Sequence, residues 1–245
     1  MNNPRDSLYD LRMFLTTEYP CGYLPGHGAR NLVADPAMTN NHLYTRLAEL
    51  GFRRSGDHVY RPHCRGCTAC RSLRIPVEKF RPNRSQRRIW SRNQDLQAQL
   101  QEAIFLDEHF DLFARYIMVR HPGGGMDPAS PENYWSFITS RWCSTSLCEF
   151  RHDQKLLAVA VVDWLDDGLS AVYTFFDPLE EARSLGTLAI LWQIAEARRL
   201  GLRWVYLGYW IEQCEKMAYK ARLTPHEVFV TERWGWVAVE TGTSF

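Results

Sequence analysis

The sequence predicts an α+β fold. Three runs rich in β-branched and aromatic residues, "LCEFRH", "KLLAVAVVDWL" and "LSAVYTFFDP", lie between residues 147 and 178, and turn residues that favour hairpins separate them. A helical pattern, "SLGTLAILWQIAEARRLG", follows and leads into one more β-rich run, "LRWVYLGYW". Antiparallel strands followed by a helix and a further strand are typical of α+β domains.

The first third of the chain predicts loops, one helix and two strands. Residues 1–36 are punctuated by Gly and Pro, which favour loops. "TNNHLYTRLAELGF" predicts a short helix, with polar residues at its start and Gly51 just past its end. "HVYRP" and "SLRIPVEKF" are typical of strands, and they flank a cysteine-rich turn.

Three more helices are expected between and after these elements. "DLQAQLQEAIFLDEHFDLFARYIMVRH" has helical periodicity throughout, "ENYWSFITSRW" predicts a second helix and "EQCEKMAYKAR" a closing one. The later half therefore reads helix, helix, three antiparallel strands, helix, strand, helix, which is the order of a GNAT-type acyltransferase. We expect a smaller cysteine-containing, basic region at residues 1–92 and the acyltransferase-like domain at residues 93–245.

Composition indicates a globular, cytosolic protein. Of 245 residues, 45% are apolar and 23% charged, which suits a packed core. The first 20 residues lack the apolar stretch of a signal peptide, and no apolar run reaches the roughly 18 residues that span a bilayer. In the cytosol the seven cysteines are expected as thiols, metal ligands or catalytic groups rather than disulfides.

Positive charge is concentrated in one segment. Residues 71–92 hold seven Arg and one Lys against one Glu, a net charge of +7, whereas the whole chain carries +1. Arginine forks bind phosphate, and the aromatic residues between them can stack on unpaired bases. A solvated helix face normally mixes charge signs, so the segment favours RNA or another polyphosphate as a partner.

Cys64, Cys67 and Cys70 form a C-x-x-C-x-x-C motif. Three thiolates at this spacing could bind one metal ion, but structural zinc and iron–sulfur clusters usually take four ligands. His63 is too close to Cys64 along the chain, so Cys21 is the better fourth candidate. The alternative is that these cysteines are small buried hydrophobic residues.

Polar residues of the later half indicate a candidate acyl-transfer site. Asp177 ends a predicted strand, and Arg183 and Gly186 begin the next helix, where acetyltransferases of this fold carry a Q/R-x-x-G-x-G/A loop that binds pyrophosphate. Leu188 replaces the second small residue, which weakens the prediction of coenzyme A. An ordinary turn at Asp177 is the alternative.

Two further motifs could line a site. In "YLGYW", Tyr206 and Tyr209 lie on opposite faces of a strand, so one of them can face a cleft. Lys216 and Lys220 continue the i, i+4 spacing from Glu212 along the closing helix, which is either a binding face or an ordinary solvent face.

Taken together, these stretches resemble the bacterial aminoacyl-tRNA-protein transferases, the leucyl/arginyl-transferase family of the N-degron pathway. The resemblance spans residues 20 to 225 and rests on "CGYLP", "YRPHCRGCTACRSLRIPVEKFRPNRSQRRIWSRN", "YTFFDP" with "SLGT", "YLGYWI" and "CEKMAYKAR". It implies a GNAT-like domain that transfers leucine, or alternatively arginine, from tRNA to proteins beginning with Asp or Glu. Membranes and DNA are not expected as partners.

The chemistry of such a transfer predicts roles for individual residues. Asp177, or a water that it holds, is expected to be the general base and Tyr209 to donate a hydrogen bond to the reacting centre, while Lys216 or Lys220 binds the acceptor carboxylate. The residues expected to bind tRNA are Arg74, Arg81, Arg84, Arg87, Arg88, Trp90, Arg92 and Arg183. No cofactor is required.

Metal binding stays open at this stage. Eukaryotic members of the family have been associated with an iron–sulfur or other metal site that uses paired cysteines. This chain has a single cysteine in "CGYLP" and no adjacent pair, so zinc or a cluster at Cys21, Cys64, Cys67 and Cys70 is an open alternative.

Two other classes of function remain. A coenzyme-A-dependent N-acetyltransferase would share the fold but would not need the +7 segment. A non-catalytic, zinc-containing RNA-binding protein would explain residues 60–92 but not "YTFFDP" or "YLGYWI".

Overall fold

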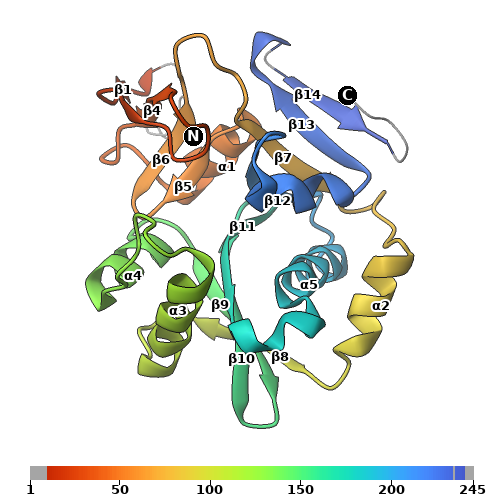
Figure 1. Cartoon of the computed structure of the whole chain (residues 1–245). Helices are drawn as coiled ribbons and strands as arrows, with labels where there is room; N and C mark the ends of the chain where they lie inside the picture. Colours follow the sequence, from red (N-terminus) through yellow and green to blue (C-terminus); the bar gives the residue numbers. More distant parts are fainter. Residues whose placement is uncertain (1–9, 234, 241–245) are drawn as a thin grey trace, which may run out of the picture.

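The computed structural model describes residues 10–233 and 235–240, and an eight-stranded sheet runs through it (Figure 1). The spatial order is β14-β13-β7-β12-β11-β10-β9-β8, and every neighbouring pair is antiparallel except β11 with β12. The strands are β7 (Arg71–Pro76), β8 (Gln97–Glu102), β9 (Thr145–His152), β10 (Lys155–Trp164), β11 (Gly168–Phe176), β12 (Trp204–Trp210), β13 (His226–Val230) and β14 (Gly235–Val239). A mixed fold with a large sheet is therefore confirmed.

Helices cover both faces of this sheet (Figure 1). α5 (Leu185–Arg199) packs on one face with α2 (Arg84–Arg92) beside it, whereas α3 (Asp107–Arg120) and α4 (Pro131–Ile138) cover the other face. Each face buries its own apolar core. α5 also connects β11 to β12, since parallel neighbours need a long crossover rather than a tight turn.

A second, smaller sheet and one helix form an N-terminal module, residues 13–62 (Figure 1). Helix α1 (Asn41–Glu49) begins where predicted, because the Asn40 side chain accepts a hydrogen bond from the Leu43 N–H at 2.8 Å. The strands are β1 (Met13–Leu15), β4 (Asn31–Ala34), β6 (His58–Pro62) and β5 (Arg53–Ser55), in that spatial order, with a separate pair formed by β2 (Tyr19–Pro20) and β3 (Gly28–Ala29).

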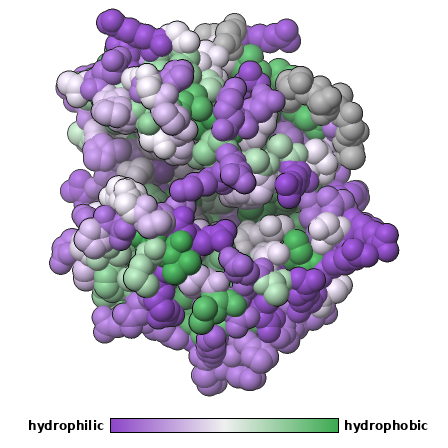
Figure 2. Space-filling view, viewed as in Figure 1, coloured by the Kyte–Doolittle hydropathy of each residue, from purple (hydrophilic) through white to green (hydrophobic). Residues whose placement is uncertain are grey.

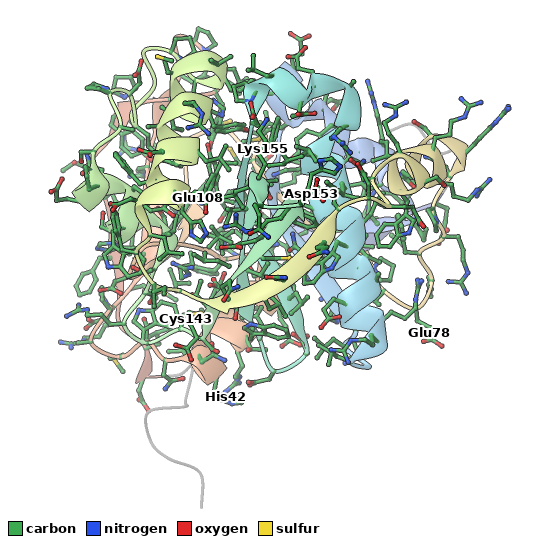
Figure 3. The ribbon with its side chains drawn as sticks, turned by 90° about the horizontal axis from the view of Figure 1, so that it is seen from below. His42, Glu78, Glu108, Cys143, Asp153 and Lys155 are labelled. Carbon is green, nitrogen blue, oxygen red and sulfur yellow. The ribbon has the colours of Figure 1, made fainter. Side chains whose placement is uncertain are left out.

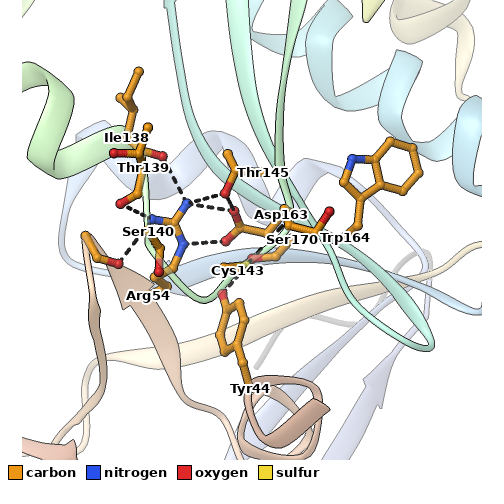
Figure 4. Close-up of polar contacts among 12 residues, drawn as sticks. Tyr44, Arg54, Ile138, Thr139, Ser140, Cys143, Thr145, Asp163, Trp164 and Ser170 are labelled. Carbon is orange, nitrogen blue, oxygen red and sulfur yellow. Dashed lines mark hydrogen bonds and ion pairs between the residues drawn. The ribbon is translucent and has the colours of Figure 1, made fainter. Parts of the chain in front are cut away.

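A buried ion pair joins the module to the large sheet (Figure 4). The guanidinium of Arg54 on β5 donates twice to the carboxylate of Asp163 on β10, at 2.6 Å for each contact, and both side chains are fully buried. Its remaining donors reach the carbonyl oxygens of Gly56, Ile138 and Thr139. The pair therefore ties together the module, the sheet and the end of α4.

The long helix predicted at residues 95–121 is wrong over its first part. Gln97–Glu102 forms edge strand β8, and the helix begins only at Asp107. Pairing with β9 overrides the helical pattern of a segment whose side chains are all exposed.

The elements after β12 also differ from the prediction. The closing helix is reduced to α6 (Glu215–Ala218) and the 3-10 turn η4 (Tyr219–Arg222). Strands β13 and β14 follow and were not predicted, since their partner β7 comes from far earlier in the chain.

The predicted division at residue 92 stays a prediction. Strand β7, from the expected first region, lies inside the large sheet between β12 and β13. Residues 1–9, 234 and 241–245, which the two predicted regions include, lie outside the described residues. Within residues 10–233 and 235–240, no helix is both long and apolar enough to cross a membrane.

Replacing Asp163 by Ala should lower the free energy of unfolding by about 3 to 5 kcal/mol, because it leaves the Arg54 cation buried without its counter-ion. Urea unfolding measures the loss. Glu196→Ala is the matched control: it breaks an ion pair with Arg199, whose side chain is 67% exposed, and should cost about 1 kcal/mol or less. Equal losses in the two variants would contradict the anchoring role.

Candidate functional site

The candidate site begins where the two parallel strands separate. Pairing of β11 with β12 ends at Ser170 and Tyr206, although β11 continues to Phe176 and β12 to Trp210. We call the region between Val172–Phe176 and Leu207–Trp210 the β11–β12 split. Ligands of sheets that contain parallel strands commonly bind beyond the carboxyl ends of those strands.

Both strands carry an extra residue next to the split. The β10–β11 register leaves Val172 unmatched, and the β12–β7 register jumps from Tyr206 to Tyr209. Gly208, inside that jump, has φ +74°, a conformation that favours glycine. Such bulges bend strands and often lie beside functional sites. The two bulges therefore account for the separation of β11 and β12 at the split.

Aromatic side chains from α3 and β11 pack beside the split. Tyr116 contacts the rings of Tyr173 and Phe176 at centroid distances of 6.1 and 4.9 Å, and Phe137 contacts Tyr173 at 5.1 Å. The Tyr173 hydroxyl is buried and has no hydrogen-bond partner within the described residues. Apolar side chains are also visible between polar ones near the centre of Figure 2.

Lys220 is half-buried next to the split. It comes from η4, and its Nζ donates to the carbonyl oxygen of Tyr209 at 2.7 Å, beside Gly208. Burial and the nearby Arg53 lower the pKa of Lys220 to about 7, although Cys214 acts in the opposite direction. A lysine at this position can therefore change its charge near neutral pH.

Lys216 is exposed on α6 and lies near the end of α3. Burial, Lys216 and Arg120 all lower the pKa of His121, which favours the neutral form of its ring, and Arg120 pairs with Glu181 at 3.1 Å. The exposed Lys216 ammonium suits an anionic ligand. Sequence reasoning missed His121 and Arg53, which carry no motif; the glycine inside a strand pattern at Gly208 was the one available signal.

Asp177 lies at the carboxyl end of β11. Its carboxylate accepts the Leu179 N–H at 3.0 Å and faces the Lys155 ammonium at 3.1 Å. Burial alone would raise the pKa of Asp177, but the Leu179 N–H and the Lys155 cation outweigh burial and hold it below the usual value. The Asp177 carboxylate is thus already paired with Lys155. Its role as the general base stays a prediction.

Tyr209 faces the N-terminal module. Its hydroxyl donates to the carbonyl oxygens of Tyr60 at 2.9 Å and Gly51 at 3.3 Å, and burial raises its pKa well above the usual value. The hydroxyl is therefore engaged in holding the module to β12. Its predicted contact with the reacting centre stays a prediction.

The basic segment forms helix α2, whose outer face carries the predicted arginines. Side chains with terminal nitrogens project into solvent from this helix, at the right of Figure 3. A shallow surface hollow is lined by Arg84, Arg87, Arg88, Ser91 and Arg92. None of these arginines forms an ion pair within residues 10–233 and 235–240, and Trp90 beside them is 38% exposed.

The helix leads to the start of α5. Arg92 donates to the carbonyl oxygen of Ala182, and the Asn93 side chain donates to that of Arg183 at 2.9 Å. Ala182 and Arg183 belong to the turn η3 (Pro178–Arg183), which joins β11 to α5. The arginine-rich surface thus ends near the carboxyl end of β11.

Three other predicted tRNA-binding arginines already have partners inside the protein. Arg74 pairs with Glu227 at 2.6 Å between the rings of Trp204 and Trp236. Arg183 makes two contacts with Asp95, at 2.8 and 2.9 Å. Arg81, in contrast, is exposed and donates only to backbone carbonyl oxygens.

The cysteines of the motif lie near one another. Burial and then Cys64, Cys21, Cys67 and Cys214 raise the pKa of the Cys70 thiol to about 12. Among the described residues, no three or more His, Cys, Asp or Glu side chains have a geometry that would hold a metal ion, and metal binding requires deprotonated thiols. Binding of zinc or a cluster at Cys21, Cys64, Cys67 and Cys70 stays a prediction, which metal analysis of the purified protein would test.

Comparison with known proteins gives consistent matches. Family models described as "Arginine-tRNA-protein transferase", N terminus and C terminus, match residues 19–88 and 108–230. Aspartate/glutamate leucyltransferases from Nitrosococcus oceani and Pseudomonas fluorescens are 55% and 52% identical, over 93% and 91% of this chain and 97% and 96% of theirs. The same enzyme from Hahella chejuensis is 50% identical, over 93% of this chain and 98% of its own.

Similarity to solved structures is weaker. The C-terminal domain of a putative lysylphosphatidylglycerol synthetase from Agrobacterium fabrum is 16% identical, with a TM-score of 0.49 over 72% of this chain and 61% of that one.

Tyr209→Phe should lower the free energy of unfolding by about 1 kcal/mol, because two carbonyl oxygens lose a buried hydroxyl donor. Urea unfolding measures the change. Tyr219→Phe is the control, since Tyr219 is 42% exposed, and it should change stability by no more than about 0.5 kcal/mol. Unchanged stability in Tyr209→Phe would argue against the anchoring contact.

Proposed function

The chain belongs to the arginine-tRNA-protein transferase family, and we propose that it transfers leucine from leucyl-tRNA to the N-terminal amine of proteins that begin with Asp or Glu. The observation that carries this proposal is the identity of 50 to 55%, over more than nine tenths of the chain, with aspartate/glutamate leucyltransferases. The product carries an N-terminal leucine, which marks it for degradation. Arginine transfer is the second candidate, because the family models carry that name.

We further propose that the large sheet is a GNAT-like acyltransferase domain. Two parallel strands joined by α5, a split between their carboxyl ends and bulges on both sides support this assignment. The acyl group and the acceptor amine would meet in the split. The cytosol, where aminoacyl-tRNA is available, is the expected location.

The tRNA is proposed to bind along α2. Arg84, Arg87, Arg88 and Arg92 line one exposed surface without carboxylate partners in the described part of the chain, which leaves their forks available to phosphates. Because this helix ends against η3, a strand bound there would direct its aminoacylated end towards the β11–β12 split. Arg74 and Arg183 would act only by giving up their present partners.

The reaction asks little chemistry of the protein. The aminoacyl ester is already activated, and an α-amine with a pKa of about 8 is partly neutral at physiological pH. Holding both substrates in contact can supply about 7 to 11 kcal/mol in ideal cases. No cofactor is required for attack of an amine on an ester.

We assign the recognition of the acceptor's first residue to Lys216 on α6. Lys216, with His121 and Arg120 near it, can bind the carboxylate of an N-terminal Asp or Glu. An uncharged first residue would leave the Lys216 cation without the partner that it binds in the complex.

Purified protein should transfer labelled leucine from leucyl-tRNA to peptides beginning with Asp or Glu, and not to the same peptide beginning with Ala. The discrimination should reach tenfold or more, since an unpaired charged group costs about 1 to 3 kcal/mol. Transfer of arginine without transfer of leucine would favour the second candidate function, an arginyl-tRNA-protein transferase. Equal labelling of Asp and Ala peptides would remove the acidic-acceptor assignment, and no transfer from any charged tRNA would overturn the proposal.

Replacing Arg84, Arg87 and Arg88 together by Ala should weaken tRNA binding and reduce the slope of log K against log salt by about 0.7 to 0.9 per lost phosphate contact. Arg12, Arg141 and Arg199 form the matched control, because their side chains are 68%, 87% and 67% exposed and each already pairs with a carboxylate. The control removes the same charge and should leave the salt slope nearly unchanged. Equal slopes in both triple variants would mean that α2 does not touch phosphates.

A further inference from the structure

We propose that Lys220 is the general base that takes the proton from the attacking α-amine. This inference rests on the proposed transfer reaction and assigns its proton transfer to one side chain. Lys220 lies beside the bulge of β12, next to the β11–β12 split in which the two substrates are proposed to meet.

Position distinguishes Lys220 from the other lysines. The chain contains four, and Lys79 and Lys216 are exposed, while Lys155 pairs with Asp177 and Glu180. Lys220 alone is half-buried and lacks a carboxylate partner within the described residues, because its one recorded contact is the Tyr209 carbonyl oxygen. Its amine therefore keeps hydrogen-bonding capacity for a substrate.

The surroundings of Lys220 disfavour its charged form. Arg53 on β5 is a buried cation that donates to the carbonyl oxygens of Phe52 and Leu73, and its Nε has no partner in the described structure. Burial and then Arg53 lower the pKa of Lys220 to about 7, and Cys214, after β12, opposes them. Near neutral pH a large fraction of this amine is neutral and can accept a proton, as a base of matched pKa should.

Gly208 lies beside the amine at a backbone conformation that favours glycine. A Cβ at this position would come within 3.8 Å of the Lys220 Nζ, and the φ of +74° disfavours any residue with a side chain. The bulge thus presents the Tyr209 carbonyl to the lysine.

The step balances without another reagent. The α-amine nitrogen attacks the ester carbonyl carbon of the aminoacyl-tRNA, a C–N bond forms, and neutral Lys220 takes the proton from that nitrogen. The C–O ester bond then breaks, and the departing ribose oxygen receives the proton from the Lys220 ammonium. Lys220 ends the cycle neutral.

The other two candidates are less suited to this step. The carboxylate of Asp177 is held by Lys155 and the Leu179 N–H, and its lowered pKa makes it a weak base. The hydroxyl of Tyr209 donates to two carbonyl oxygens and is protonated at neutral pH.

Lys220→Arg separates a base from a carboxylate-binding cation, because arginine keeps the charge but cannot accept a proton at neutral pH. We expect at least about a hundredfold loss in kcat, with tRNA affinity within twofold of the unchanged protein. The kcat of the unchanged protein should rise with pH and level off above about 7, and this inflection should be absent from Lys220→Arg. Lys79→Arg, an exposed site with the same substitution, is the control and should keep the rate and the inflection.

A second measurement does not depend on activity or on the folding of a variant. With ¹³Cε-lysine labelling, the four lysines should give four titrating NMR signals, one of them with a midpoint near pH 7. All four midpoints above pH 9 would overturn the proposal, and so would a Lys220→Arg protein with the normal rate and inflection. Loss of the inflection in Asp177→Asn but not in Lys220→Arg would assign the base to Asp177. An unchanged protein that transfers nothing from any charged tRNA would instead refute the proposed function, and the NMR midpoint would still be measurable.

Discussion

The arrangement of the whole molecule depends on one parallel strand pair. β11 and β12 are neighbours running in the same direction, so a helix must connect them, and α5 occupies one face of the sheet for that reason. The pairing lasts for only three residue pairs and then stops. Each strand bends away at a bulge, which creates the split at the carboxyl ends of both strands. The end of α2, the turn η3, Lys220 and the aromatic side chains of α3 all lie around that point.

The neighbouring residues Arg53 and Arg54 are both buried cations, but their surroundings differ. Arg54 is fully buried but neutralised by Asp163, with its remaining donors on backbone carbonyl oxygens, and it serves as a fixed joint between the N-terminal module and the sheet. Its chain neighbour Arg53 is also buried, but it donates to carbonyl oxygens and lies over the Tyr206 ring, 5.1 Å from the ring centroid, with no carboxylate partner in the described part of the chain. Burial and then the Arg53 cation lower the pKa of Lys220. Arg54 therefore contributes to stability, whereas Arg53 favours the neutral form of Lys220, which the proposed base requires.

The contact between α2 and η3 links the proposed tRNA-binding surface to the proposed reaction site. A phosphate-binding surface would be of little use to an acyltransferase if it ended far from the reacting atoms. Here the arginine-rich helix packs on α5 and its last residues hold the turn that enters α5. Long-range electrostatic attraction along α2 and short-range chemistry in the split can therefore act on the same bound tRNA.

The sequence by itself determined the elements whose patterns are local. The cap at Asn40, the three hairpin strands β9 to β11, helix α5 and the concentration of arginines at residues 71–92 follow from residue types within a few positions of one another, and resemblance of the motifs identified the family. That residues 84–92 form helix α2 was not predicted.

Only the tertiary structure decided which distant residues meet. Residues 97–102 form strand β8 because they pair with β9. Strand β7 pairs with β12 and β13 inside the large sheet. Arg74 and Arg88 look alike in the sequence, yet Arg74 pairs with Glu227, 153 positions away, while Arg88 faces solvent. Lys220 and Arg53 are likewise separated along the chain, and their mutual repulsion depends on burial and distance, which no local pattern encodes.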